Sequence, residues 1–157
     1  MNAVSHLNAQ DGLQVLLRLL IAVLGGGLIG WNRQIEGKPA GLRTHMLVSL
    51  GSAIIVMMPL QTNDPPSDEA MSRVIQGVAT GVGFLGAGEI LHQSRQGDKP
   101  VVKGLTSAAA IWTTAALGMT AGCGLWLTSL MGTLLVWAIL TWVKRLEQAI
   151  GVRTDRD

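Results

Sequence analysis

Four residues that could bind an ion lie in one short loop between two long apolar runs. They are Arg33, Lys38, Arg43 and Thr44, and the last two stand where the second apolar run begins. A helix that starts there presents unpaired N–H groups, which favour an anion or a carboxylate. Two interpretations fit these residues: an ion- or phosphate-contacting vestibule, or a basic loop that anchors to lipid head groups.

Glu89 is the one acidic residue inside an apolar run, two residues before that run ends. An ionisable group within a membrane span is a candidate for function, whereas a carboxylate so close to the end could instead form a structural ion pair with Arg43 or Arg95. We expect Glu89 to meet Arg43 and Thr44 at the cytoplasmic ends of neighbouring helices. With Thr106, which opens the fourth run, the candidate cluster is Arg33, Lys38, Arg43, Thr44, Glu89 and Thr106.

Three acidic residues, Asp64, Asp68 and Glu69, separate the second and third runs. Their oxygens suit Mg²⁺ or Ca²⁺, and the alternative is a hydrated acidic loop that also pairs with Arg18. The three histidines are too scattered to suggest a transition-metal site. No nucleophile stands beside a general base, so we expect neither an enzyme nor a cofactor.

Five apolar runs must position these residues, each close to the ~20 residues with which a helix crosses a bilayer. They cover residues 13–31, 45–60, 74–91, 105–121 and 125–143. The chain has 157 residues, of which 48% are hydrophobic. We therefore expect a single all-α membrane domain of five transmembrane helices, with no soluble C-terminal domain.

The basic residues predict the orientation of this bundle. Of the twelve lysines and arginines, all but Arg18 and Arg73 lie in the first loop, the third loop or the C-terminal tail. Loops rich in these residues stay cytoplasmic, which predicts an outer N-terminus and a cytoplasmic C-terminus. The net charge of +2 then reflects topology, and nucleic acid is not an expected partner.

Glycines are expected to bring the helices together, because glycines four positions apart let helix backbones approach closely. The positions singled out are Gly26, Gly30, Gly77, Gly81, Gly83, Gly86 and Gly88. Most of them lie in the third run, which predicts that the third helix is central. The glycine faces also predict a homo-oligomer. The fourth run is small and weakly polar on every side and should lie inside the bundle, whereas the fifth should face lipid.

A short repeat relates the first two runs to the next two. Gly-Gly-Gly-Leu-Ile-Gly at 25–30 parallels Gly-Val-Gly-Phe-Leu-Gly at 81–86, and Gly-Leu-Arg-Thr at 41–44 parallels Gly-Leu-Thr-Ser at 104–107. Both halves run from outside to inside and back, so the repeat would be a parallel one that leaves out the fifth helix. Chance similarity between two glycine-rich hairpins is the alternative.

Three ordered segments resemble the MgtC/SapB family of bacterial inner-membrane proteins. They are GKPAGLRTHMLVSLGS at 37–52, RVIQGVATGVGFLGAGEI at 73–90 and VKGLTSAAAIW at 102–112. The resemblance covers residues 12 to 145 and implies a protein connected with growth at low magnesium. Some members of the family inhibit the F-type ATP synthase, so the resemblance also implies a possible link to that enzyme.

The chain departs from the family pattern in two ways. Members commonly carry an acidic residue just before the arginine that matches Arg33, where this chain has Asn32. Glu36 or Glu89 could supply the missing carboxylate. Many members also carry a C-terminal cytoplasmic domain, which we do not expect here.

Two functions remain open at this point. The first is a regulatory or interaction protein that acts on another membrane complex, such as the F-type ATP synthase, during ion stress. The second is a channel or transporter for Mg²⁺ or another cation, built around the helix starts at Arg43 and Thr106 together with Glu89.

Overall fold

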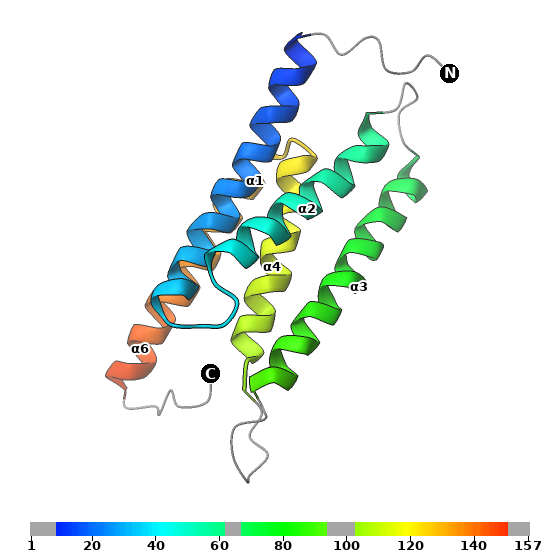
Figure 1. The fold of residues 1–157 in the computed structure, drawn as a ribbon. Coiled ribbons are helices and arrows are strands. Elements are labelled where there is room, and N and C mark those ends of the chain that lie inside the picture. Colours follow the sequence, from blue (N-terminus) through cyan, green and yellow to red (C-terminus); the bar gives the residue numbers. More distant parts are fainter. Residues whose placement is uncertain (1–8, 62–66, 94–102, 151–157) are drawn as a thin grey trace.

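The computed structural model describes residues 9–61, 67–93 and 103–150, which form helices and the short connections between them (Figure 1). The helices are α1 (Ala9–Ile35), α2 (Leu42–Leu60), α3 (Asp68–Gln93), α4 (Leu105–Gly122) and α5 (Trp126–Ala138). A π-helical turn, η1 (Ile139–Val143), extends α5 into α6 (Lys144–Ala149). No strand occurs in these residues, and the all-α prediction is confirmed.

Four helical stretches are long and apolar enough to cross a membrane: Gly12–Ile35, Leu42–Leu60, Asp68–Leu91 and Trp126–Leu146. The remaining long helix, α4, is not among these candidate spans, and it is built largely from alanine, threonine and glycine. It contacts α1, α2, α3 and α5. Because its neighbours shield it from lipid, α4 needs little apolar surface of its own, and it lies inside the bundle as predicted.

Glycines bring α1, α2 and α4 into backbone contact. A Cβ atom added to Gly26 of α1 would lie 2.6 Å from the carbonyl oxygen of His45 in α2. One added to Gly122 of α4 would lie 2.7 Å from the carbonyl oxygen of Ala53, also in α2. Side chains do not approach a backbone so closely, so the packing of these three helices depends on the missing Cβ atoms.

The prediction that the third helix is central is wrong. α3 packs mainly on α4 and only lightly on α2, at one side of the bundle (Figure 1). A Cβ atom at Gly77, Gly81, Gly83 or Gly88 would meet nothing within 4 Å, whereas one at Gly86 would lie 3.4 Å from Ala108 Cβ. Glycine spacing marks a face that can pack closely, but it does not tell whether a partner helix is there.

α5 lies at the periphery, as the sequence predicted. Leu127, Leu130 and Leu135 are exposed on one side, and Ser129 and Thr133 are buried on the other. Both buried hydroxyl groups donate hydrogen bonds to helix carbonyl groups. A helix of this kind presents large aliphatic groups to lipid and satisfies its few polar groups internally.

Contacts in the two halves of the chain correspond. A Cβ atom at Gly30 would lie 3.0 Å from His45 Cβ, and one at Gly86 would lie 3.4 Å from Ala108 Cβ. Gly30 is equivalent to Gly86 in the repeat, and His45 is equivalent to Ala108. At these two glycines, the packing of α1 on α2 therefore resembles the packing of α3 on α4, which supports a parallel repeat.

The orientation in the membrane is open to a labelling test. In a Cys123→Ala background, a cysteine at Gln10 should react with an impermeant maleimide on intact cells, and a cysteine at Ile150 should react only after permeabilisation. The native thiol of Cys123 is removed so that only the introduced cysteine can be labelled. Burial already raises the pKa of Cys123 and so slows its reaction with maleimide. Labelling of position 150 from outside intact cells would contradict the predicted orientation.

Candidate functional site at the inner ends of the helices

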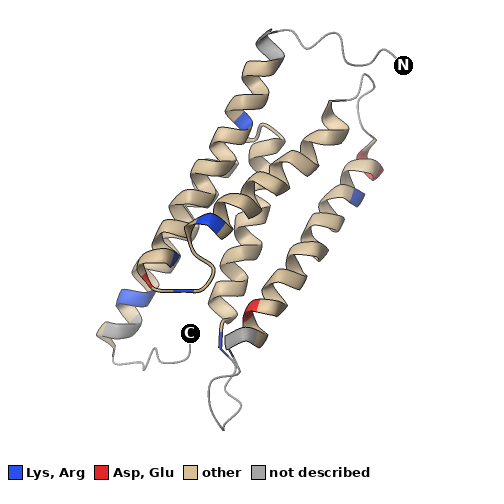
Figure 2. Cartoon of the chain, in the orientation of Figure 1, with Lys and Arg blue, Asp and Glu red and all other residues tan. Residues whose placement is uncertain are grey.

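Charged residues gather at the end of the bundle where α1 and α3 finish and where α2 and α4 begin (Figure 2). This end carries most of the basic residues and is therefore the predicted cytoplasmic end. At its centre lie side chains from α1, α2, α4 and α6 that are largely withdrawn from the surface. We call Arg33, Glu36, His45, Ser107 and Lys144 the inner cluster.

Arg33 is the most deeply buried charged residue in the part of the chain that the structure describes, with 2% of its surface exposed. Its Nη1 lies 3.2 Å from Glu36 Oε2, and its Nη2 donates a 2.8 Å hydrogen bond to Ser107 Oγ. The planar guanidinium group can serve two partners in fixed directions. Arg33 thereby ties the last turn of α1 to the first turn of α4.

Glu36 is shared between two cations. Its Oε2 accepts from Arg33 and lies 3.1 Å from Lys144 Nζ of α6. A second link between the same segments is the 3.4 Å hydrogen bond from Asn32 Nδ2 to Thr141 Oγ1. Where family members commonly have a carboxylate, Asn32 makes this neutral contact, and Glu36 supplies the carboxylate to Arg33.

His45 has no exposed surface. Its Nδ1 lies 2.9 Å from the carbonyl oxygen of Gly41, while its Nε2 has no hydrogen-bond partner among the described residues. Arg33 and Glu89 are both close enough to act electrostatically on the ring. The inner cluster therefore contains a fully buried imidazole, and the charges of Arg33 and Glu89 both act on it.

The structure divides the cluster predicted from sequence. Arg33 lies at its centre, and Glu89 is half-buried near His45. Arg43 and Thr44 are exposed and are not part of the inner cluster, and their gathering with Glu89 at the cytoplasmic helix ends stays a prediction. Lys38 and Thr106 are half-buried, and it is Ser107, the neighbour of Thr106, that contacts Arg33.

The sequence analysis missed His45, although a signal for it exists. The buried positions of α2 include His45, Ser49, Ser52, Ala53 and Val56, which recur at the spacing of one helix face. This face is weakly polar and contains a histidine, so it differs little in hydropathy from the opposite face. A histidine in register with small buried residues indicates a buried imidazole even when no second histidine is near in sequence.

Arg33 and Glu89 hold equivalent positions in the two halves, three residues after Gly30 and Gly86 respectively. Arg33 of the first half contacts Ser107 in the second half. Glu89 of the second half acts on His45 in the first. The two halves thus contribute opposite charges, and each charge faces the second helix of the other half.

At the outer end, the structure describes only part of the acidic cluster predicted to bind a metal ion. Asp64 lies outside the described residues, and the exposed Glu69 forms an ion pair with the exposed Arg73. Within the described ranges no group of three or more His, Cys, Asp or Glu residues could hold a metal ion. Arg18, which was expected to pair with these acids, makes a different contact. Its Nη1 donates a 3.0 Å hydrogen bond to the carbonyl oxygen of Gly122 and so caps the C-terminus of α4.

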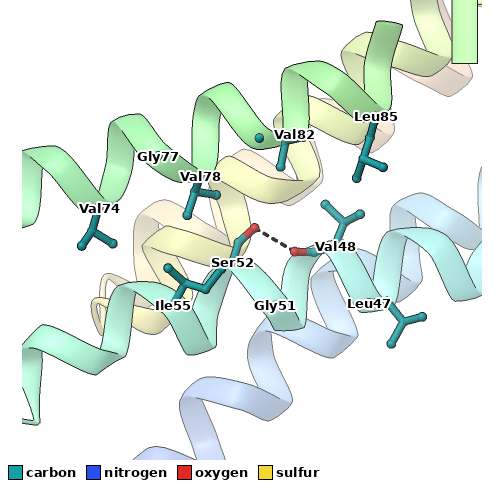
Figure 3. Close-up of a pocket in the computed structure, with 11 residues that line it drawn as sticks. Leu47, Val48, Gly51, Ser52, Ile55, Val74, Gly77, Val78, Val82 and Leu85 are labelled. Atoms are coloured by element: carbon teal, nitrogen blue, oxygen red, sulfur yellow. Dashed lines mark hydrogen bonds between the residues drawn. The ribbon is translucent and has the colours of Figure 1, made fainter. Parts of the chain in front are cut away.

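Two apolar grooves open on the sides of the bundle. One, of about 520 Å³, lies between α2 and α3 and is lined by aliphatic side chains and by glycines (Figure 3). Its polar Ser52 donates to the Val48 carbonyl oxygen of its own helix at 2.8 Å. The other, of about 300 Å³, lies between α1 and α5. Both linings suit hydrocarbon, either an acyl chain or an apolar helix.

Comparison with known proteins gives a consistent result. The sequence model of the MgtC family matches residues 19–149. "Protein SrpB" of Synechococcus elongatus is 49% identical over 91% of this chain and 82% of SrpB. "Putative magnesium transporter YhiD" of Escherichia coli K12 is 38% identical over 81% of this chain, and "Protein MgtC" of Salmonella typhimurium is 36% identical over 77%. The matched region spans 59% of YhiD and 48% of MgtC. No solved structure matches.

Proposed function

Because this chain belongs to the MgtC family, we propose that it regulates another complex of the bacterial inner membrane when magnesium is scarce. The F-type ATP synthase is the proposed target, since the resemblance to MgtC/SapB proteins includes inhibition of that enzyme. The magnesium connection is supported by the name of the relative YhiD, "Putative magnesium transporter YhiD". In this proposal the chain contributes contact surfaces to a partner and conducts no ion.

The observation that carries the proposal is the closed packing of α1, α2 and α4. Backbone atoms of these helices meet at Gly26, Gly30, Gly118 and Gly122, along most of the length of α2. Two buried hydroxyl groups donate within their own helices, Ser52 Oγ to the Val48 carbonyl oxygen and Thr114 Oγ1 to the Ala110 carbonyl oxygen. Helices in such contact leave little room for a hydrated cation.

The open face of α3 supports an interaction role. Gly77 and Gly81 line the groove against α2, and a Cβ atom at either would meet nothing within 4 Å. Small residues at this spacing allow another helix to approach within van der Waals distance. We propose this face as the contact for the regulated complex, with a homo-oligomer as the form in which the chain itself occurs.

The alternative function is cation transport. It is favoured by one specific observation: the two repeat halves bring Arg33 and Glu89 to the same buried imidazole, and repeat interfaces are where transporters place their sites. A transport route would have to continue from the inner cluster to the outer end through the contacts of α1, α2 and α4. Transport therefore requires a second arrangement of these helices.

The regulatory proposal is tested with inverted membrane vesicles that contain the F-type ATP synthase. Addition of this protein to the membrane is expected to lower ATP-driven proton pumping severalfold, and Gly81→Leu should remove that effect because it fills the open face of α3. Thr128→Leu, which adds the same side chain to the exposed face of α5, is the matched control and should still inhibit. Equal pumping with and without the protein would reject the ATP synthase as target.

A further inference from the structure

We propose that the groove between α1 and α5 binds one anionic phospholipid, with an acyl chain along the groove and the phosphate on Arg18 at its outer end. The proposal rests on the lining of the groove, on the bonding of its polar groups and on the cation at its mouth. It does not depend on which membrane complex the protein regulates.

The groove has a volume of about 300 Å³ and large apolar walls. The walls are formed mainly by Ile21, Leu24 and Leu28 of α1 and by Trp126 and Leu130 of α5. Between the walls the two helices meet at Gly25, where an added Cβ atom would lie 3.1 Å from Thr133 Oγ1. From Ile21 to Leu28 the groove follows α1 for about 10 Å, which is most of the ~15 Å of hydrocarbon in one leaflet.

The two hydroxyl groups in the lining are already bonded to the protein. Ser129 Oγ donates to the carbonyl oxygen of Leu117 at 3.4 Å, and Thr133 Oγ1 donates to that of Ser129 at 2.7 Å. Neither hydroxyl proton is therefore offered to a ligand. The part of the ligand that lies in the groove should be hydrocarbon.

Arg18 stands at the outer end of the groove. It lies three residues before Ile21, on the same face of α1. Its Nη1 donates to the carbonyl oxygen of Gly122 at 3.0 Å, and a Cβ atom at Gly124 would lie 3.1 Å from Nη2. The guanidinium group therefore rests against the turn that joins α4 to α5. The side chain is half-buried, and none of the ion pairs among the described residues includes it.

A cation at the mouth of an apolar groove fits the two parts of a phospholipid. A guanidinium group forms strong, charge-assisted hydrogen bonds with phosphate oxygens, and Trp126 beside it is of the residue type that prefers the level of the head groups. A helix of another protein would have to bring a carboxylate to this depth, whereas every phospholipid carries its phosphate there. We expect an anionic lipid, because the amine of a zwitterionic head group offsets the charge of the phosphate.

Native mass spectrometry tests the proposal, with protein released from micelles that contain phosphatidylglycerol and phosphatidylcholine in equal amounts and with the same acyl chains. The parent should retain phosphatidylglycerol about fivefold over phosphatidylcholine, the effect of one basic residue on binding to anionic lipid. Arg18→Gln should lose this preference. Arg73→Gln, which removes another arginine of the predicted outer end, should keep it. Equal retention of both lipids by the parent would overturn the proposal, and so would an undiminished preference in Arg18→Gln, which would assign the lipid to the basic inner end.

A second pair of variants tests the groove while Arg18 stays in place. Leu130→Trp fills the groove and should lower the retention of phosphatidylglycerol severalfold. Leu127→Trp makes the same change on α5 at a position that is 69% exposed and outside the groove, and it should match the parent. Equal retention by the two variants would show that the groove does not hold the acyl chain. A dimer that is lost only in Leu130→Trp would assign the groove to a second copy of the chain and overturn the proposal.

Discussion

Gly118→Ala is expected to destabilise the bundle by about 1–3 kcal/mol, near the upper end of the range for overpacked cores. The new Cβ atom would overlap the carbonyl oxygen of Ser49 and lie 2.8 Å from its α-carbon. Both are backbone atoms of α2, so no side chain can rotate away and the helices must separate. The loss of stability is measured by heating the protein in detergent and determining, by gel filtration, the fraction that stays monodisperse at each temperature.

Gly81→Ala is the matched control, because it adds the same methyl group to another membrane helix. A Cβ atom there meets nothing within 4 Å, and alanine favours a helix over glycine by roughly 0.5–1 kcal/mol. The variant should be as stable as the parent or slightly more so. If Gly118→Ala and Gly81→Ala were equally stable, the contact between α2 and α4 would not be as close as described.

Arg33→Met should cost about 3–5 kcal/mol, the usual cost of removing one partner of a buried ion pair. It would leave Ser107 without its donor and Glu36 with Lys144 alone, and it would release α4 from the end of α1. Arg33→Lys should recover only part of the stability, because one ammonium group cannot reach two partners in different directions. The same thermal unfolding assay reports both variants.

Arg73→Met is the comparison for this variant. Arg73 also forms an ion pair with a glutamate on its own helix, but both side chains are more than 70% exposed. Exposed pairs contribute ~0–1 kcal/mol, so this variant should unfold close to the parent. An equally large loss at Arg73 would mean that burial is not what makes the Arg33 contacts strong.

The arrangement of α4 follows from composition, whereas that of α3 does not. A run rich in Ala, Thr and Gly has too little apolar surface for lipid, so its burial could be predicted without knowledge of the other helices. α3 has a stretch of glycines that permits close packing on any side. Which face meets a neighbour depends on the crossing of α2 over α1 and α4, and residues far apart in sequence determine that crossing.

The inner cluster was only partly predictable for a similar reason. Arg33 and Glu89 are recognisable as charges at the ends of apolar runs, and the helix start at Arg43 was the predicted partner of Glu89. The contacts of Arg33 with Ser107 and Glu36 were not predicted. The choice depends on how far each side chain lies from the bundle axis, which hydropathy and spacing along one helix do not contain.

A closed bundle that regulates a membrane complex is not expected to conduct ions itself. The most direct test reconstitutes the purified protein in liposomes and measures Mg²⁺, K⁺ and H⁺ flux, with an ionophore as the positive control for sealed vesicles. For all three ions, the flux is expected to equal that of empty vesicles. Flux of any of them above that level, and lost in Arg33→Met protein shown to be folded, would contradict it and establish transport.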